Sequence, residues 1–235
     1  MSAGGQRVLI TGAASGLGAA LADAFEARGD RVLRTDVRGE RGLETGLRPS
    51  STAVLGLDIT SDDDWAAALS HVEETWGGLD VLVNNAGVAG GGRLDVATHD
   101  EWQWIFDINL FGMVRGLRTF VPMLKRQGSG AIVNVASMGA YAPVPGQSLY
   151  GATKAAVAQL SRGLHSELMA TNVQVTGVFP GAIGTNIAVN SAIMTPEEMA
   201  AMSAGAGGKE RKATPAPEAG QQIVAAVEKG SYEIF

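Results

Sequence analysis

Short apolar runs alternate with longer helical stretches along most of this 235-residue chain. RVLIT (7–11) is typical of a buried strand, and it is followed by a glycine-rich turn and a helical stretch from Leu17 to Arg28. Strands that alternate with helices in this way predict βαβ units with right-handed crossovers. Further strands are predicted at 31–35, 52–57, 79–84, 131–137 and 173–179, and YEIF (232–235) reads as the beginning of a seventh.

The predicted fold class is therefore α/β, a doubly wound parallel sheet of about seven strands with helices on both faces. No linker or change in composition divides residues 1–235, so we expect a single domain. Ser61 is placed to cap a helix whose first turn holds three aspartates, 62–64. A long helix is predicted from Asp100 to Gln127 and another from Tyr150 to about Met169.

Residues 186–214 interrupt this regular pattern. They show no strand or helix periodicity, and they contain methionines at 194, 199 and 202 and a basic run at 209–212. A long irregular segment in a compact α/β domain is usually a lid or a binding loop. We expect this segment to cover the substrate.

Charge and composition exclude several classes of function. Eighteen basic residues against twenty-four acidic ones give a net charge of −6 without any basic block, so neither nucleic acid nor an anionic membrane is an expected partner. The chain lacks cysteine, and His71, His99 and His165 lack paired-ligand spacing, so no metal site is expected. Without a signal pattern or a long apolar run, a soluble cytoplasmic protein is expected.

The glycine-rich turn TGAASGLG (11–18) directly follows the first strand and opens the first helix. Backbone N–H groups and the dipole at a helix N-terminus bind anions, and glycines let a pyrophosphate approach the main chain. Asp36, at the end of the second strand, is placed to accept hydrogen bonds from the ribose of NAD. Arg34 and Arg38 flank Asp36 and could contact a 2′-phosphate instead. The candidate phosphate-binding residues are Gly12, Ser15, Gly16, Leu17 and Gly18.

Tyr150 and Lys154 are four residues apart on a predicted helix, so their side chains share one face. A dinucleotide of this kind carries hydride chemistry, which needs a group that moves the proton of an alcohol. Tyr150 is the candidate for that group.

These segments together resemble the short-chain dehydrogenases/reductases (SDR). The resemblance covers residues 7–185 and implies a single-domain Rossmann-type fold. Family members usually continue with a strand and a short tail, so the sequence leaves open whether the native chain extends beyond Phe235. The matching segments, in family order, are TGAASGLG (11–18), Asp36, LDI (57–59), NNAG (84–87), Asn109 in DINLFG, Ser137 in NVASMG, YGATK (150–154) and PGAIGT (180–185).

The resemblance implies four catalytic roles. Tyr150 would be the general acid/base, and Lys154 would bind the nicotinamide ribose and lower the pKa of Tyr150. Ser137 would orient the substrate oxygen, and Asn109 would hold a water that links Lys154 to solvent. Moving the pKa of a tyrosine from about 10 toward neutrality requires roughly 4 kcal/mol of differential stabilisation. A lysine cation one turn away and the positive oxidised nicotinamide both favour the phenolate.

The resemblance also implies further cofactor contacts. Asp58 and Ile59 would meet the adenine, and Asn85 would lie on the adenosine side. Ile183 and Thr185 would contact the nicotinamide carboxamide. In the family, the helix that begins near Tyr150 and the long helix before it usually form interfaces, which implies a homo-oligomer, either a dimer or a tetramer; packing within one chain is the alternative.

The substrate is expected to be an apolar small molecule. In the family the pocket is lined by residues after NNAG, residues near the serine and the tyrosine, and the lid. A carboxylate or a heavily hydroxylated substrate would require donors or an arginine there. Of Trp102 and Trp104, two apart on one helix, one is expected in the core and the other at the pocket edge or an interface. The corresponding pocket residues are apolar and uncharged: Val88, Ala89, Met138, Gly139, Pro143 and Val144.

The function that follows is an NAD(H)-dependent oxidoreductase that interconverts a secondary alcohol and a ketone. One alternative is an NADPH-dependent 3-oxoacyl reductase, which Asp36 and the absence of a basic docking face argue against. A non-catalytic nucleotide-binding family member is another, although such proteins typically lose the tyrosine or the lysine. A sugar epimerase or dehydratase is disfavoured by the TGxxxGxG spacing and the short chain.

Overall fold

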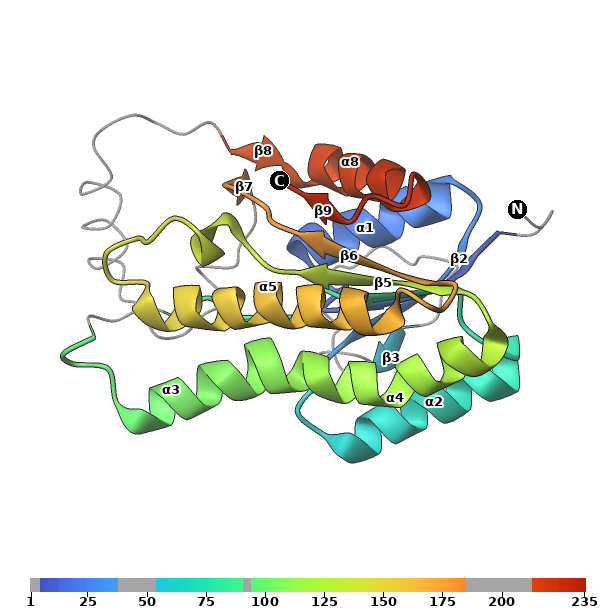
Figure 1. The fold of residues 1–235 in the computed structure, drawn as a ribbon, viewed down its shortest axis with the longest axis horizontal. Helices are drawn as coiled ribbons and strands as arrows, with labels where there is room; N and C mark the ends of the chain where they lie inside the picture. The colour runs from blue at the N-terminus through green and yellow to red at the C-terminus, as the bar shows by residue number, and fades with distance from the viewer. Residues whose placement is uncertain (1–4, 38–53, 91–93, 185–212) are drawn as a thin grey trace.

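A seven-stranded parallel sheet forms the centre of the molecule, with the strand order β3-β2-β1-β4-β5-β6-β9 (Figure 1). The computed structural model describes residues 5–37, 54–90, 94–184 and 213–235. All six strand pairings within this sheet are parallel, as predicted. The strands are β1 Arg7–Thr11, β2 Arg31–Asp36, β3 Val54–Gly56, β4 Val81–Asn84, β5 Gly130–Val135, β6 Val173–Val178 and β9 Glu233–Ile234.

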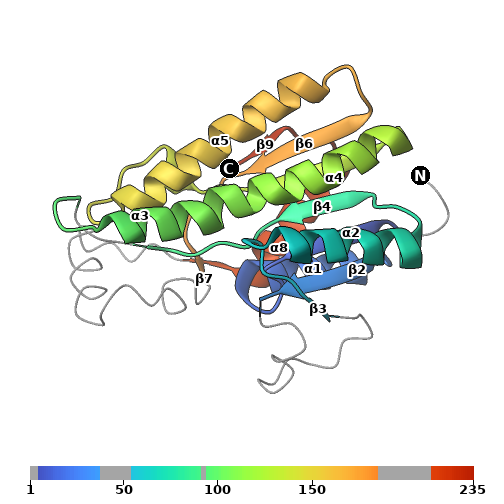
Figure 2. The same ribbon diagram turned by 90° about the horizontal axis from the view of Figure 1, so that it is seen from below.

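Helices cover both faces of the sheet, which confirms the doubly wound arrangement. Helices α1 (Gly16–Ala27) and α8 (Ala216–Glu228) pack together on one face, and α2 (Asp62–Trp76), α4 (Met113–Gln127) and α5 (Ser148–Leu168) lie on the other (Figures 1 and 2). The cores follow from strand alternation, because successive side chains point to opposite faces. In β1, Val8 and Ile10 enter the core under α1 and α8, whereas Leu9 enters the larger core under the other helices.

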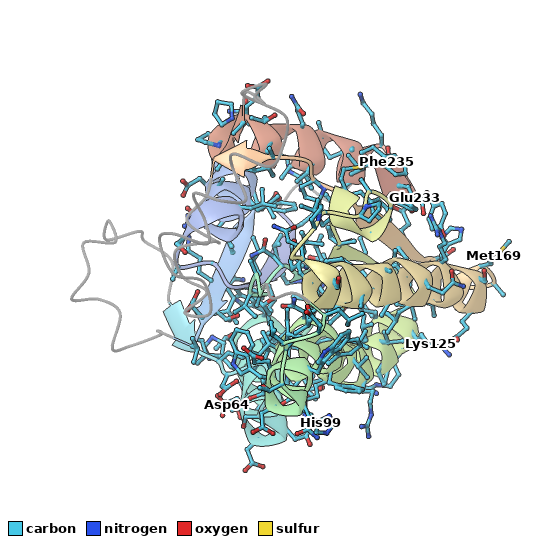
Figure 3. All side chains as sticks on the ribbon, turned by 90° about the vertical axis from the view of Figure 1, so that its left-hand side faces the viewer. Asp64, His99, Lys125, Met169, Glu233 and Phe235 are labelled. Carbon is cyan, nitrogen blue, oxygen red and sulfur yellow. The ribbon has the colours of Figure 1, made fainter. Side chains whose placement is uncertain are left out.

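Local signals set several helix ends. Ser61 caps α2 as predicted, since its Oγ accepts a hydrogen bond from the Asp64 N–H at 3.1 Å. Thr98 and Glu101 form a capping box at the start of α3 (His99–Phe106). Helix α4 ends at Gly128, whose φ of +78° is readily adopted by glycine. Lys125 lies in the last turn of α4 and points outward at the periphery (Figure 3), where a cation complements the helix dipole.

The predicted long helix is continuous but not uniform. Between α3 and α4 the backbone forms a π-helical turn, η2 (Asp107–Gly112), which contains Asn109. Such a turn carries one extra residue and recurs at functional sites, and nothing in the apolar periodicity marks it. The prediction for the tryptophans was wrong in part: Trp102 stacks on Phe106 instead of entering the core, and Trp104 is 36% exposed at the cavity edge.

One further difference concerns the C-terminal third. Ile183–Gly184 (β7) pairs with Thr214–Pro215 (β8), so the predicted irregular segment ends in a short strand rather than a loop. The rest of the expected lid, together with Thr185 and Arg38, lies outside the described residues. A separate 3-10 turn, η3 (Met138–Ala140), directly follows Ser137.

In the described ranges no helix is both long and apolar enough to cross a membrane.

Candidate active site

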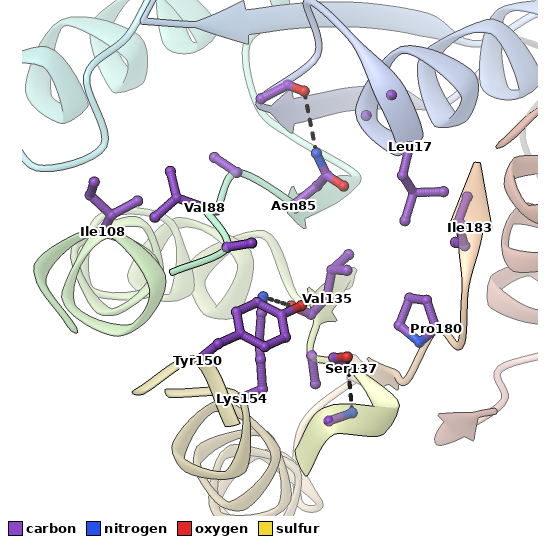
Figure 4. A pocket seen from close by; sticks show the side chains of 18 of the residues that line it. Leu17, Asn85, Val88, Ile108, Val135, Ser137, Tyr150, Lys154, Pro180 and Ile183 are labelled. Atoms are coloured by element: carbon purple, nitrogen blue, oxygen red, sulfur yellow. Dashed lines mark hydrogen bonds between the residues drawn. The ribbon is translucent and has the colours of Figure 1, made fainter. Parts of the chain in front are cut away.

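A cavity of about 970 Å³ opens at the carboxyl ends of the strands, where ligands bind in open α/β sheets (Figure 4). It is lined by the turn after β1, the end of β2 and the segments after β3, β4, β5 and β6. Every described candidate residue from the sequence lines it, with the exception of Asn109. These residues are Gly12, Ser15, Gly16, Leu17, Gly18, Asp36, Asp58, Ile59, Asn85, Ser137, Tyr150, Lys154 and Ile183.

The glycine-rich turn brings bare main chain to the cavity. Gly12 and Gly16 have φ angles of +67° and +58°, a region that favours glycine. A Cβ on Gly18 would lie 2.2 Å from the Gly12 carbonyl oxygen, so no larger residue fits there. Ser15 caps α1 in an extended conformation without a side-chain capping bond. The N-terminal N–H groups of α1 therefore have room for an anion close to the backbone, which fits a pyrophosphate.

Asn85 fastens this turn to β4. Its Nδ2 donates to the carbonyl oxygens of Thr11 at 2.9 Å and Gly12 at 3.3 Å. Its main-chain N–H donates to the Thr11 Oγ1 at 3.0 Å. Asn85 thus positions the phosphate turn, in addition to the adenosine contact that the family resemblance predicts.

Asp36 lies beside the same turn. It is nearly buried, and its Oδ2 accepts a hydrogen bond from the Ala14 N–H at 3.1 Å. Arg34 lies on the same face of β2, two residues earlier, and reaches along α1, where its Nη2 lies 2.6 Å from Asp23 and 2.7 Å from Glu26. Because its guanidinium is already paired with two carboxylates, Arg34 does not face the ribose position beside Asp36.

Asp58 and Ile59 form the wall beyond β3. The Asp58 Oδ1 accepts hydrogen bonds from the main-chain N–H and the hydroxyl of Thr60, at 2.9 and 2.7 Å. Ile59 packs on η2 so closely that a Cβ on Gly112 would lie 2.6 Å from its Cδ1. These contacts hold the segment next to the cavity, and the predicted adenine contacts stay predictions.

Tyr150 and Lys154 project from the first turns of α5 toward Ser137 and Val135 at the end of β5 (Figure 4). The Lys154 Nζ is buried and donates a hydrogen bond to the Val135 carbonyl oxygen at 3.0 Å. Burial lowers the pKa of Lys154 to about 8, because the interior disfavours the charged form. Burial raises the pKa of Tyr150, and a hydrogen bond with Ser137 offsets part of that increase.

This electrostatic balance differs from the expectation for Tyr150. The sequence predicted that the charge of Lys154 would lower the pKa of the phenol. In the protein alone, burial outweighs the bond to Ser137, and the ammonium of Lys154 is directed to a carbonyl oxygen. The interior therefore favours a neutral Tyr150 in the protein alone.

Asn109 lies behind the cavity wall, and its side chain makes three hydrogen bonds. Its Oδ1 accepts from the Val88 N–H at 2.8 Å, and its Nδ2 donates to the Val88 carbonyl at 2.9 Å and to the Thr153 Oγ1 at 3.1 Å. The predicted water that links Lys154 to solvent would have to be held by the main chain of Asn109 or by the second lone pair of its Oδ1. That role stays a prediction.

The remaining wall of the cavity is mostly apolar. Of the predicted pocket residues only Pro143 is absent from it, because Pro143 lies in a shallower groove beside α5. The sequence reasoning did not identify Ile108 as a pocket residue, although its spacing of four from Trp104 places both on one helix face. Ala142, Gln147 and Pro180 also line the cavity. Among the residues that the structure describes, no group of His, Asp or Glu could hold a metal ion.

Known proteins match this arrangement. The profile of the short chain dehydrogenase family matches residues 6–195. A 3-alpha-(or 20-beta)-hydroxysteroid dehydrogenase of Mycobacterium tuberculosis is 35% identical over 182 residues, which cover 77% of this chain and 70% of the relative. A short chain dehydrogenase/reductase of Burkholderia phymatum in complex with NAD is 27% identical with a TM-score of 0.85, covering 98% of this chain and 88% of that one. A serine dehydrogenase complexed with NADP+ has the same identity and TM-score, covering 97% and 92%.

The fold and the cavity thus define a dinucleotide-binding α/β protein. The chain belongs to the short-chain dehydrogenase family, as the motifs in its sequence predicted. It is an oxidoreductase of that family, whose solved relatives include complexes with either nicotinamide dinucleotide.

Proposed function

We propose that this protein is an NAD(H)-dependent oxidoreductase that interconverts a secondary alcohol and a ketone on an apolar small molecule. The observation that carries the proposal is the convergence of Ser137, Tyr150 and Lys154 on the cavity that the glycine-rich turn opens. The name of the mycobacterial relative, a hydroxysteroid dehydrogenase, is consistent with a secondary alcohol on an apolar body.

The cofactor would lie along the carboxyl edge of the sheet. The N-terminus of α1 and Gly12, Gly16 and Gly18 would hold the pyrophosphate, and Asp36 would accept hydrogen bonds from the adenine ribose. When bound, NAD supplies the hydride acceptor, and NADH the hydride donor. Ile183, at the start of β7, would meet the nicotinamide carboxamide, and so would Thr185 just beyond it.

Tyr150 would move the proton. In the oxidative direction its phenolate takes the proton of the substrate hydroxyl as the carbon loses hydride, and in the reductive direction its phenol returns a proton to the carbonyl oxygen. Ser137, which lines the cavity with Tyr150, would donate to the same substrate oxygen and orient it.

Burial of Tyr150 means that the protein must offset an unfavourable environment for the phenolate. Two positive charges are available for this: protonated Lys154 and the oxidised nicotinamide. We infer that Lys154 leaves the Val135 carbonyl for the nicotinamide ribose when the cofactor binds. This change would bring the ammonium closer to the phenol oxygen of Tyr150. The general base would then form only in the binary complex.

The substrate class follows from the apolar side chains of the cavity. Trp104 and Ile108 from the α3–η2 segment line it together with Met138 and Val144, and these four side chains carry no charge. An apolar ketone or secondary alcohol loses little solvation there, whereas the one cation among the described lining residues is Lys154, which the proposed mechanism assigns to the nicotinamide ribose.

We also propose a homo-oligomer, either a dimer or a tetramer, in the cytoplasm. The support for assembly is the exposed aromatic surface of α3 and η2, where Phe111 is 50% exposed and forms a shallow pocket with Trp102, Trp104 and Phe106. Sedimentation of the purified protein tests this, since a monomer at micromolar concentration would contradict it.

The central experiment is a screen of NAD+ reduction against secondary alcohols, with the matching ketones assayed with NADH. We expect turnover that is greatest for apolar, uncharged substrates and that Tyr150→Phe removes. A protein that binds NADH but converts no member of either series would instead be a nucleotide-binding member without this activity.

A further inference from the structure

Thr153 links the first turn of α5 to the π-helical turn behind the cavity. Its side chain is fully buried between the two elements. The Oγ1 accepts a hydrogen bond from the Asn109 Nδ2 at 3.1 Å and donates one to the main-chain carbonyl of Tyr150 at 2.8 Å. Asn109 in turn holds both main-chain groups of Val88. One hydroxyl group therefore ties together three segments that border the site.

The place of Tyr150 in its helix makes such a link necessary. Tyr150 is the third residue of α5, in the first turn, where N–H groups lack partners within the helix and the backbone frays. Gln147 at the N-cap makes no side-chain capping bond that would hold this turn. The bond from Thr153 to the Tyr150 carbonyl runs within the turn, and the bond from Asn109 anchors the turn to η2.

We propose that Thr153 is a positioning residue that fixes the main chain of Tyr150 relative to η2 and so sets the place of the phenol beside Ser137. This inference rests on the proposed function, because it concerns the same proton-transferring tyrosine. Thr153 contacts neither the cavity nor the reacting atoms and acts only through Tyr150 and Asn109. Lys154, the next residue in the chain, is carried by the same turn.

The same helix supplies a matched control. Ser161, two turns further on, is also buried, donates its hydroxyl to the Val157 carbonyl at 2.8 Å and accepts a hydrogen bond from the Asn134 Nδ2 at 3.0 Å. Removing the Ser161 hydroxyl takes away the hydrogen-bond acceptor of the Asn134 Nδ2, whereas the Asn109 Nδ2 keeps the Val88 carbonyl when the Thr153 hydroxyl is removed, so the Ser161 change should cost folding at least as much. Only the Thr153 hydroxyl is bonded to the main chain of Tyr150.

The test compares Thr153→Val, Thr153→Ser and Ser161→Ala with the parent, using kcat, KM, the NADH dissociation constant and the melting temperature. Thr153→Val is expected to lower kcat about tenfold or more, since small misplacements of reacting groups are costly, with NADH affinity changed by less than about twofold. Thr153→Ser restores the hydroxyl and should stay within about threefold of the parent. Ser161→Ala should lose at least as much stability as Thr153→Val but keep kcat within about twofold.

Three results would overturn the inference: an unchanged kcat in Thr153→Val, an equal loss of kcat in Ser161→Ala, or no rescue by serine. If the parent converts no alcohol or ketone, that result contradicts the proposed function but does not bear on the positioning role of Thr153. The positioning role is then decided by comparing crystal structures of the parent and of Thr153→Val. A displaced Tyr150 hydroxyl supports the positioning role, and a Tyr150 hydroxyl in the same place overturns it.

Discussion

The Nζ atom of Lys154 lies 5.7 Å from the centre of the Tyr150 ring, while its hydrogen bond goes to the carbonyl of Val135. The two residues share a helix face, as their spacing predicted, but in the protein alone the ammonium is bonded to the Val135 carbonyl and not to the phenol oxygen. In the proposed mechanism their electrostatic coupling therefore depends on cofactor binding.

Tyr150→Phe should abolish turnover and leave NADH binding within about threefold of the parent. Only the hydroxyl group moves a proton, and such groups contribute about 10²–10⁴-fold to the rate. Steady-state assays combined with NADH fluorescence titration measure both quantities. Activity within about threefold of the parent would show that another group transfers the proton.

Lys154→Met should slow turnover, weaken NADH binding and raise the apparent pKa of the base in the pH–rate profile. The reason is that the lysine both binds the nicotinamide ribose and favours the phenolate in the proposed mechanism. An apparent pKa that stays in place would show that Lys154 does not tune Tyr150.

The same substitution should stabilise the cofactor-free protein in a pH-dependent way. Below about pH 8 Lys154 is charged in both the folded and unfolded states, and the folded state bears the cost of burying the charge. Between pH 8 and 10.5 the folded protein releases the proton first, so the free energy of unfolding of the parent rises with pH, by up to about 3 kcal/mol. Lys154→Met avoids the cost but loses the bond to Val135, worth about 1 kcal/mol.

We therefore expect Lys154→Met to be more stable than the parent by about 2 kcal/mol at pH 7, with an advantage that shrinks toward pH 10. Urea unfolding at several pH values measures it. Lys125→Met, at an exposed position in the last turn of α4, is the control and should show no such trend. A constant difference between the variant and the parent across this range would contradict a lowered pKa for Lys154.

Gly18→Ala should remove NADH binding. The added Cβ would lie 2.2 Å from the Gly12 carbonyl and 2.5 Å from the Asn85 Nδ2, so the phosphate turn would have to move. Ala19→Gly, in the same turn of α1, costs about 1 kcal/mol of helix stability without any clash and serves as the control. Calorimetric NADH titration should detect binding in the control alone; binding by both would show that the turn does not hold the pyrophosphate.

The enzyme should prefer NAD(H) to NADP(H). A 2′-phosphate beside Asp36 would bring like charges together, which costs about 4 kcal/mol per pair at a partly buried site and corresponds to a preference of a hundredfold or more. Asp36→Ala should lower the ratio of kcat/KM for NAD(H) to kcat/KM for NADP(H). Arg34→Gln should leave it nearly unchanged, because Arg34 is paired with Asp23 and Glu26. Equal kcat/KM values in the parent would refute the role of Asp36.

The sequence alone determined the sheet, the order of helices and strands, and most of the candidate site. Local rules suffice for these features: apolar runs mark buried strands, Ser61 caps its helix, and glycines mark the turn where α1 begins. In a parallel sheet the carboxyl ends of the strands meet at one edge, so Asp36 and Ser137 had to converge although a hundred residues separate them.

Only the tertiary structure decided how the side chains are used. The π-helical turn that contains Asn109 packs against α5, and in it the asparagine side chain forms hydrogen bonds with Val88 and Thr153. The pKa of Tyr150 depends on burial, which no local spacing encodes, and burial reversed the direction expected from Lys154 alone. Hydrogen-bond partners and desolvation are set by residues far apart in the chain, so they follow from the assembled fold and not from any single motif.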